Sequence, residues 1–380
     1  MKKIQNLLKT ASLIFISIIS ISCHDVIFDE VRNEVKLSKS QISGNVNSLI
    51  RHYDANESIE YLYTSNGRLW RRDINDSSSV TGKYAGYWVQ VERPTTKIST
   101  IASEYDGAKS YLYAVSSNIQ EVSDDGENEL INRSIYFSEN GTDWNIITDS
   151  SDSISFSEIT QSSMIFVFGT NTVKKENRAV FANVNGMIYR LQAGVATIIS
   201  KDSTYIDLSS TSQSVAYLDG KFYFSTNYSM CSNETKDLEA TCIYTGSSTV
   251  NYRTASDDDW NSVDPSISTI RSIAYTADNL IIGTTAGLEK VILSSDTLDA
   301  NGLMYVPTNS TGSFSSNAAS ALSSYYEIWK LLVCDPSLET ETGDIFAAET
   351  YTGSSSSSSA SRQNEGLWAF YPNRGNWNRE

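Results

Sequence analysis

Short apolar and aromatic runs alternate with polar turns along most of the chain. The clearest example is four runs of six residues, separated by turns, at 98–103, 110–115, 133–138 and 143–148. Short runs rich in β-branched and aromatic residues are typical of β-strands. The pattern therefore predicts an all-β protein.

A hydroxyl-rich strand recurs along the chain with a period of about 57 residues. Its copies are Thr100–Ser103, Ser157–Thr160, Gln213–Ala216 and Arg271–Ala274. A second apolar strand follows each copy, at 111–114, 165–168, 222–224 and 280–283. Similar pairs near residues 49–63 and 329–348 begin and end the series. The spacing predicts six repeat units.

Four tryptophans mark the same period. Trp88, Trp144, Trp260 and Trp377 are 56, 116 and 117 residues apart, and the last three precede an Asn. One period of about 57 residues accounts for these gaps if two units lack the Trp. We expect each Trp to lie at the outer strand of its unit and to pack between neighbouring units.

Six units of about four strands are the sequence pattern of a β-propeller. Each small sheet has two apolar faces, and a radial arrangement buries both. The prediction is a six-bladed β-propeller over residues 46–380. A seventh blade formed from residues 300–328 is the alternative, which we favour less because that stretch lacks strong strands.

One turn resembles a known family motif. The segment Tyr136-Phe137-Ser138-Glu139-Asn140-Gly141-Thr142-Asp143-Trp144 resembles the Asp-box, or BNR, turn, which runs Ser-x-Asp-x-Gly-x-x-Trp. This segment is one residue short, and Asn140 stands at the acidic position. The resemblance implies a propeller turn held by bonds from Ser138 and Asn140 to the backbone. Asp-boxes are structural, so the resemblance supports a fold and no activity.

The N-terminus has the form of a secretion signal. Lys2, Lys3 and Lys9 precede twelve uncharged, mostly apolar residues, a stretch too short to span a bilayer. It ends at Ser22-Cys23, which resembles the lipobox of bacterial lipoproteins in the relaxed form found in Bacteroidetes. The resemblance implies that residues 1–22 are removed and that Cys23 is lipidated. Residues 23–45 would then form a tether, and the protein would be an outer-membrane lipoprotein of the cell envelope, with the leaflet left open.

The remaining cysteines suit an oxidising compartment. Cys231 and Cys242 bracket a short polar loop, and outside the cytoplasm we expect them to form a disulfide. Cys334 lies in an apolar run and is expected to be a buried free thiol. With only two histidines, His24 and His52, the sequence predicts no metal site and no cofactor.

Composition narrows the choice of partners. The chain has 45 Asp and Glu against 29 Lys and Arg, for a net charge of −16. A surface this acidic repels phosphate backbones, which argues against nucleic-acid binding. We expect a monomer whose partner is a protein or a glycan.

The candidate ligand-binding residues are aromatic and cationic side chains near loops and inner strands. Tyrosine rings on a rigid face can stack on sugars or peptide side chains. The cations are placed near the start of inner strands, where they can meet an anion in the central channel. The candidates are Tyr84, Tyr87, Tyr325, Tyr326, Arg271 and Lys330.

No catalytic motif accompanies these residues, so the sequence favours a non-catalytic binding module anchored in the envelope. One alternative is a glycoside hydrolase or lyase that uses carboxylates at the channel mouth. A second alternative is a structural component of an envelope assembly. A channel lined only by Ser, Thr and Ala would argue against the enzyme.

Overall fold

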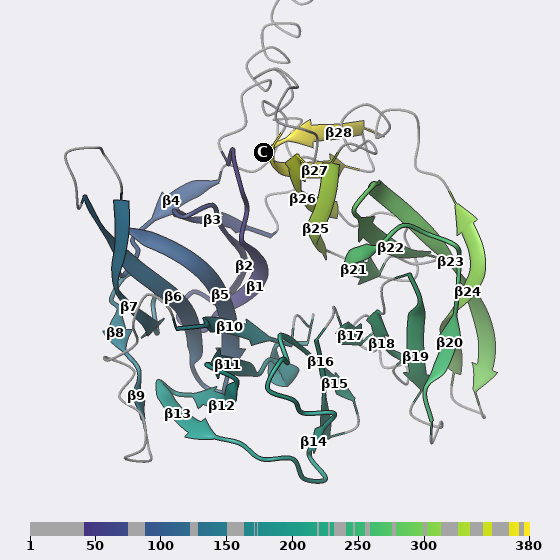
Figure 1. Ribbon diagram of the computed structural model, residues 1–380, viewed down its shortest axis with the longest axis horizontal. Coiled ribbons are helices and arrows are strands. Elements are labelled where there is room, and N and C mark those ends of the chain that lie inside the picture. The colour runs from purple at the N-terminus through teal and green to yellow at the C-terminus, as the bar shows by residue number, and fades with distance from the viewer. Residues whose placement is uncertain are drawn as a thin grey trace, which may run out of the picture.

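The computed structural model describes most of the chain between residues 42 and 380. The described ranges are 42–74, 88–121, 128–149, 163–170, 172, 174–218, 220–226, 229–231, 241–245, 248–254, 259–275, 279–298, 302–312, 326–334, 345–351, 365–371 and 376–380. They form β-strands arranged in small sheets around a centre (Figure 1). The all-β prediction is confirmed.

Hydrogen bonding groups the described strands into seven sheets, which we number as blades in chain order. Blade 1 contains β1 (Ser48–Asp54), β2 (Ile59–Ser65), β3 (Leu69–Asp73) and β4 (Val89–Val91). Blade 2 contains β5 (Lys97–Tyr105), β6 (Ser110–Glu121), β7 (Asn128–Ser138) and β8 (Asn145–Ile146). Blade 3 contains β10 (Ile165–Gly169), β11 (Val180–Val184), β12 (Met187–Gln192), β13 (Val195–Ile198) and β9 (Thr148–Asp149), which is parallel to β13.

The second half of the chain supplies four further sheets. Blade 4 contains β15 (Ser214–Leu218), β16 (Lys221–Ser225) and β14 (Tyr205–Ile206). Blade 5 contains β17 (Ser229–Cys231), β18 (Thr241–Thr245), β19 (Val250–Thr254) and β20 (Asn261–Val263). Blade 6 contains β21 (Ile270–Tyr275), β22 (Asn279–Thr284), β23 (Gly287–Leu298) and β24 (Gly302–Gly312). Blade 7 contains β25 (Tyr326–Val333), β26 (Ile345–Tyr351), β27 (Gly366–Tyr371) and β28 (Asn376–Arg379).

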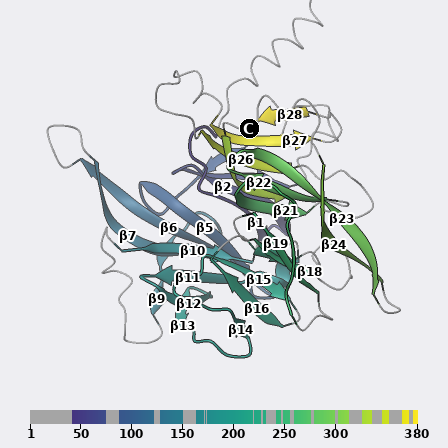
Figure 2. The same cartoon turned by 45° about the vertical axis from the view of Figure 1, so that its right-hand side comes forward.

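One edge strand of each sheet faces the centre of the ring, and each such strand contacts the next around the circle. The order is β1, β5, β10, β15, β17, β21 and β25, and β25 contacts β1. Figures 1 and 2 show this circular arrangement from two directions. A β-propeller with about four antiparallel strands per blade is therefore confirmed.

The described sheets number one more than the repeat units expected from sequence. The extra sheet comes from the fourth unit, because residues 214–263 supply both blade 4 and blade 5. It does not come from residues 300–328, where the alternative had placed it; residues 302–312 form β24 of blade 6. The number of described sheets, seven, equals the number of blades in the alternative prediction.

The third unit also differs from its sequence assignment. The expected first strand, 157–160, lies outside the described residues. The expected second strand, 165–168, is β10, which contacts the inner strands β5 and β15. Its continuous apolar pattern reflects burial on both faces at the inner position, where a strand meets two neighbouring blades.

The core is divided among the seams between neighbouring blades. Seven clusters of buried apolar residues occur in the described residues, and each joins one blade to the next. For example, Phe168 and Phe181 of blade 3 pack with Phe224 of blade 4, with ring centroids between 5.0 and 6.4 Å apart. Each sheet thus buries its two faces by packing against the two sheets beside it in the ring.

The four marker tryptophans lie where the repeat predicted. Each directly precedes or belongs to the fourth strand of its blade, and each packs against the preceding blade in the ring. Trp88 packs edge-on against Phe346 of blade 7, with centroids 5.9 Å apart. Trp260 packs in the same manner on Tyr223 of blade 4, at 5.8 Å. These indoles are blade-packing residues.

The Asn140 turn has the hydrogen bonds that the motif resemblance implied. It connects β7 to β8, the third and fourth strands of blade 2. The amide nitrogens of Thr142 and Asp143 donate to Asn140 Oδ1 at 2.9 and 2.8 Å. The Asn140 amide nitrogen donates to Ser138 Oγ at 3.3 Å. The turn is therefore held by side chains, and it contributes structure.

The ring is closed by contacts between the two ends of the described chain. Ile42 pairs with the last blade, because its N–H donates to the carbonyl of Glu380 at 3.1 Å and its carbonyl accepts from Leu367 N–H at 3.0 Å. Glu380 Oε2 also accepts hydrogen bonds from Arg72 Nη1 at 3.0 Å and Trp88 Nε1 at 2.8 Å, both in blade 1. Blade 7 is thereby joined to blade 1 by backbone and by side chains. Among the residues described, no helix has the length and apolar character needed to cross a bilayer.

Candidate functional site

The inner strands surround a cavity of about 280 Å³ at the centre of the ring. Its wall is built from β1, β5, β10, β15, β21 and β25, together with Asn47 and Gln213, which precede β1 and β15. The wall combines hydroxyl and amide groups with the aromatic rings of Phe166, Phe168 and Trp329. Concave sites with mainly apolar walls and a few polar groups are where propellers and other rigid folds can bind small ligands.

Several hydroxyls at the cavity wall are used to join the blades. Ser48 Oγ accepts from the amide nitrogen of Ile101 at 3.1 Å, and Thr100 Oγ1 accepts from that of Val167 at 3.0 Å. Ser272 Oγ donates to the carbonyl of Ile328 at 2.8 Å. In each pair a hydroxyl on one inner strand bonds to the backbone of the next inner strand. The hydroxyl-rich sequence repeat therefore reflects a structural need, since buried backbone groups require partners.

Lys330 is the one ionisable side chain that lines this cavity among the described residues. It follows a β-bulge between Ile328 and Lys330, as Thr100 and Ser272 follow bulges in β5 and β21. Lys330 thus stands at the position that carries a hydroxyl in those two strands. Burial among the channel walls lowers the pKa of the Lys330 ammonium from its ordinary value.

Arg271, the second cation expected near the channel, lies in the bulge of β21 between Ile270 and Ser272. It does not line the cavity; its neighbour Ser272 does. Arg271 forms an ion pair with Glu327 of β25, and its side chain is partly exposed.

The tyrosine candidates are only partly placed. Tyr84, Tyr87 and Tyr325 lie outside the described residues. Tyr326 begins β25, where its Cα is opposite that of Tyr351.

The cysteines fall in different parts of the chain. Cys23 lies outside the described residues. Cys231 and Cys242 are directly opposite each other on β17 and β18 of blade 5. Cys334 is half-buried, packs against the cluster between blades 7 and 1, and has no disulfide.

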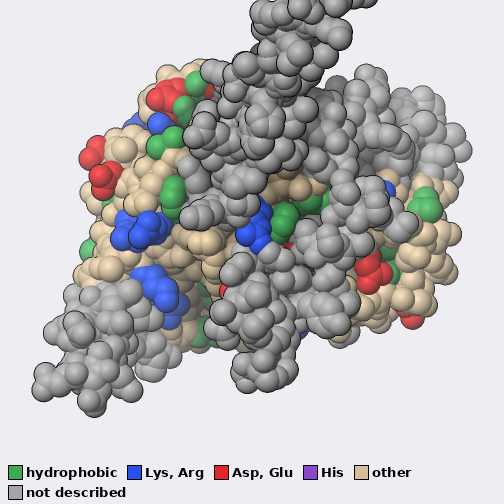
Figure 3. All heavy atoms as spheres, turned by 90° about the horizontal axis from the view of Figure 1, so that it is seen from above, with side chains coloured by type: hydrophobic (Ala, Val, Ile, Leu, Met, Phe, Trp, Pro, Cys, Tyr) green, Lys and Arg blue, Asp and Glu red, His purple; other side chains and the backbone are tan. Residues whose placement is uncertain are grey.

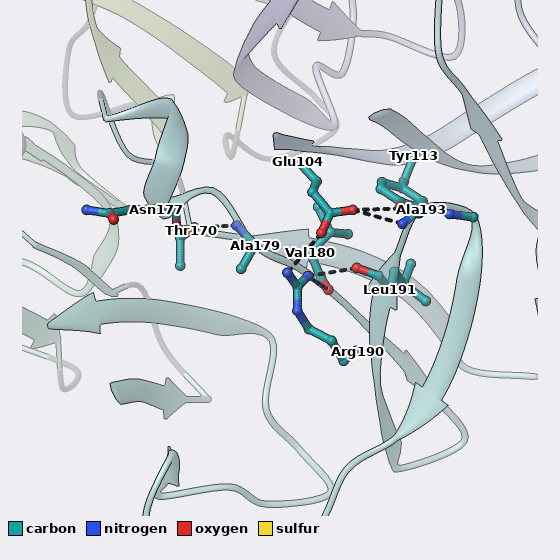
Figure 4. Close-up of polar contacts among 10 residues, drawn as sticks. Glu104, Tyr113, Thr170, Asn177, Ala179, Val180, Arg190, Leu191 and Ala193 are labelled. Carbon is teal, nitrogen blue, oxygen red and sulfur yellow. Dashed lines mark hydrogen bonds and ion pairs between the residues drawn. The ribbon is translucent and has the colours of Figure 1, made fainter. Parts of the chain in front are cut away.

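A buried ionic network joins blades 2 and 3 away from the cavity (Figure 4). Glu104 of β5 pairs with Arg190 of β12 at 2.9 Å and accepts from the hydroxyl of Tyr113 at 2.8 Å. Arg190 Nη1 also donates to the carbonyls of Val180 and Leu191 at 2.8 and 2.7 Å. Every member of this network is held by another member or by the backbone. We interpret it as a structural clamp.

The electrostatics of Glu104 agree with a structural role. Burial raises the pKa of its carboxyl above the ordinary value, against the opposing influence of Arg190 and Tyr113. The adjacent turn completes the clamp, because Gly194 donates to the Tyr113 hydroxyl at 3.3 Å. Gly194 has φ of +79°, and a Cβ there would collide with the ring of Phe137. These groups are bonded to one another, which agrees with a structural role.

His52 is buried and uncharged. Its Nδ1 is 2.8 Å from Ser103 Oγ, which links β1 to β5, and its ring packs edge-on against Tyr63. Burial, and then the positive charges of Arg178 and Arg71, lower the pKa of His52 to about 3. No carboxylate is hydrogen-bonded to His52 among the described contacts. The pair therefore lacks the third group that would orient a catalytic His.

Glu349 is a second buried carboxyl outside the cavity. It lies on β26 with no exposed surface, and neither carboxylate oxygen has a hydrogen-bond partner among the described residues. Burial raises the pKa of Glu349 to about 9, although Trp368 and Arg379 nearby oppose this shift. The group is therefore protonated at neutral pH.

The described surface offers no continuous charged face in the view of Figure 3, where Lys and Arg (blue) and Asp and Glu (red) lie in separate small groups. No group of three or more His, Cys, Asp or Glu side chains suited to a metal ion occurs in the described part of the chain. The cavity is a concave feature of the described structure that can admit a small ligand.

Sequence reasoning missed several residues of the cavity. Asn47, Phe166, Phe168 and Trp329 line it, although none was a candidate. The signal available for Trp329 was its position beside Lys330 at the start of the last unit. Residues 165–168 were assigned from the sequence to the second strand of a unit. Phe166 and Phe168 were therefore not expected on an inner strand, where they would line the channel.

Comparisons with known proteins add little beyond the ring of sheets. No family model and no curated protein matches the chain. Among solved structures, the BBS1N chain in complex with ARL6DN shares 8% sequence identity at a TM-score of 0.37, covering 89% of this chain and 96% of that one. YCF48 from Cyanidioschyzon merolae shares 10% sequence identity at a TM-score of 0.36, and the match covers 90% of this chain and 86% of that one. A functionally unknown protein from Desulfotomaculum acetoxidans DSM 771 shares 7% sequence identity at a TM-score of 0.36, and the match covers 85% of this chain and 89% of that one. Likeness this low carries no argument about function.

Proposed function

We propose that this protein is a non-catalytic binding module of the cell envelope, which recognises a protein or glycan partner through one end of the propeller channel. The observation that carries the proposal is the composition of the cavity wall. Its described lining holds one cation and no carboxylate, and three of its hydroxyls are bonded to neighbouring blades. A rigid cavity of this kind suits binding.

The enzyme alternative requires chemistry that the described lining lacks. Glycoside hydrolysis generally uses two carboxyl groups on either side of the scissile bond. The buried carboxyls that the structure describes do not line the cavity; they are Asp54, Glu104, Glu349 and Glu380. Glu104 is engaged in the clamp between blades 2 and 3. Binding therefore has the better support.

The anchoring part of the proposal rests on sequence. The basic n-region, the short apolar stretch and Ser22-Cys23 support a lipid on Cys23 and attachment to the outer membrane. Metabolic labelling with an alkynyl fatty acid tests this directly. The full chain should take up the label, and a Cys23→Ser variant should not.

Partner recognition is tested with the full chain purified in detergent. A glycan array read for both binding and product release separates a binding module from an enzyme. Crosslinking in envelope membranes, followed by mass spectrometry, tests for a protein partner. Retention of a glycan or partner without turnover supports the proposal, whereas product release overturns it.

A further inference from the structure

The ammonium of Lys175 lies against two tyrosine rings where three blades meet. Tyr53 and Tyr105 stand near the ends of the neighbouring inner strands β1 and β5, and their ring centroids are 5.3 Å apart with planes at 83°. Lys175 comes from η2 (Lys175–Asn177), the short 3-10 helix between β10 and β11 of blade 3. Its Nζ is 3.4 Å from the centroid of the Tyr53 ring and 5.0 Å from that of Tyr105. The two rings therefore form an aromatic site that holds a cation.

The rings are positioned by contacts that do not involve Lys175. The hydroxyl of Tyr105 donates to the carbonyl of Gly107 at 2.8 Å, and the ring of Tyr53 packs edge-on against that of Tyr105. Tyr53 is also fixed in blade 1, where its Cα is opposite that of Glu60 on β2. Both tyrosine side chains are half-buried, so a small ligand can reach their faces from solvent.

The loop that carries Lys175 is held by other bonds as well. Arg178 Nη2 pairs with Glu60 Oε1 of blade 1 at 2.7 Å, and Thr170 Oγ1 donates to the carbonyl of Asn177 at 2.7 Å. Lys175 itself is half-buried, and η2 contains no buried residue. The Lys175 side chain can therefore leave the rings while the loop keeps its place.

The chemistry of the site favours a different cation over Lys175. An aromatic face attracts positive charge, and quaternary ammonium groups are typical ligands of such sites. The ammonium of Lys175 has three N–H donors, which ring faces satisfy less fully than water does. A quaternary ammonium has no N–H group and gives up no such bonds on entering. The net charge of −16 further favours the approach of a cation.

We infer that Tyr53 and Tyr105 form a binding site for a small quaternary ammonium compound, which displaces the ammonium of Lys175 when it binds. The site is separate from the channel cavity, which β1 and β5 line near their beginnings, at residues 48–50 and 100–101. The inference goes beyond the proposed recognition through the channel and does not depend on it. Binding is reversible and involves no covalent step.

The first experiment uses the unmodified full chain in a maltoside detergent and two probes of the same shape. Choline carries the quaternary ammonium, and 3,3-dimethylbutan-1-ol is its neutral counterpart with carbon in place of nitrogen. Lysines are acetylated with N-hydroxysuccinimide acetate, and the rate at each site is followed by peptide mass spectrometry. Saturating choline frees the Lys175 ammonium, so it should raise the acetylation rate of Lys175 at least about twofold. The alcohol should not change that rate, and neither probe should change the rate at the exposed Lys97.

The second experiment measures choline affinity by titration calorimetry. Lys175→Gln removes the competing cation, so it should bind choline at least about fivefold more tightly than the wild type does. The matched control Lys97→Gln removes the same charge at the beginning of β5 and should bind as the wild type does. In the Lys175→Gln background, Tyr53→Leu should weaken choline binding at least about fivefold, whereas Tyr53→Phe keeps the ring and should retain it.

Several results would overturn the inference. They are an unchanged acetylation rate of Lys175 in choline, the same response to choline and to the alcohol, equal choline affinity in the wild type and Lys175→Gln, and binding that Tyr53→Leu leaves intact. The acetylation experiment needs no variant, so it decides the inference even where a variant fails to fold. Failure of the glycan and partner tests overturns the proposed function and leaves this inference standing.

Discussion

The indole nitrogen of Trp88 donates a 2.8 Å hydrogen bond to the carboxylate of Glu380, although 292 residues separate them along the chain. The same carboxylate oxygen pairs with Arg72, and the side chains of Arg72 and Glu380 are each about 1% exposed. One carboxylate thus holds two groups of the first blade against the last. This contact adds to the backbone hydrogen bonds of Ile42 and to the apolar cluster that join the same two blades.

Removing the carboxylate should destabilise the protein strongly. Glu380→Ala leaves the Arg72 guanidinium buried without its counter-charge, which typically costs about 3–5 kcal/mol. Urea denaturation followed by tryptophan fluorescence measures the loss. The matched control is Glu139→Ala, which breaks an exposed pair with Lys109 and should cost less than about 1 kcal/mol. Equal losses in the two variants would contradict the closing role of Glu380.

Replacing Glu349 with Gln should stabilise the protein increasingly as the pH rises. The folded-state pKa of Glu349 is about 9, above the ordinary value of 4.5, so the folded protein holds a proton that the unfolded chain releases. Glu349 therefore lowers the free energy of unfolding least below pH 4.5. That free energy falls as the pH rises from 4.5 toward 9.

Denaturation of the wild type and Glu349→Gln at pH 5, 7 and 9 tests this dependence. The variant should gain about 3 kcal/mol at pH 7, because it avoids the cost of protonating a carboxyl above its ordinary pKa, and more at pH 9. Glu176→Gln, at an exposed position in the short 3-10 helix Lys175–Asn177 between β10 and β11, serves as the control and should show no such trend. A variant less stable than the wild type at every pH would contradict the prediction.

His52 should remain uncharged throughout the physiological range. Its folded-state pKa of about 3 lies below the ordinary 6.5, so its contribution to stability is complete above pH 6.5 and is lost as the pH falls toward 3. NMR of the two imidazoles tests this, with the His52 signal identified by its absence from a His52→Asn variant. The signal should keep its neutral position down to pH 5. A midpoint near pH 6.5 would show that His52 is hydrated.

Cys231 and Cys242 should be joined by a disulfide. Residues directly opposite each other on antiparallel strands have Cα atoms about 4.5–5.5 Å apart, within the span of a disulfide. Closing so short a loop contributes up to about 3 kcal/mol in the loop-entropy model. Thiol titration of the denatured, unreduced Cys23→Ser chain should find one free thiol, at Cys334. Three reactive thiols would rule the disulfide out, and reductant should lower the melting temperature of the wild type but not of Cys231→Ser/Cys242→Ser.

Much of the fold could be predicted because it repeats. Each marker tryptophan lies at the fourth strand of its blade, so these residues identify outer strands. Their spacing does not count the blades, because Trp144 and Trp260 are three blades apart whereas Trp260 and Trp377 are two blades apart. The count was harder, since blade 5 begins only four residues after β16 ends and carries Trp260 as its single period marker. Inner strands such as β10 are apolar on both faces and cannot be told from second strands by alternation.

The candidate site was predictable only in part. Lys330 was found because it interrupts a row of hydroxyls, a difference visible in the aligned repeats. Arg271 occupies the neighbouring position in such a repeat, yet it pairs with Glu327 of β25 and does not line the cavity. An ion pair between two strands cannot be read from either strand alone, so the separation of these two cations required the structure.

The position of Ile42 has a mechanical consequence. Ile42 exchanges backbone hydrogen bonds with Glu380 and Leu367 of the last blade before the chain enters the first. Tension applied to the chain ahead of Ile42 is therefore transmitted directly to the junction between the first and last blades. The other six seams bear load only after that junction has opened. Resistance to stretching from this end is set by a few bonds at one seam, however stable the rest of the ring is.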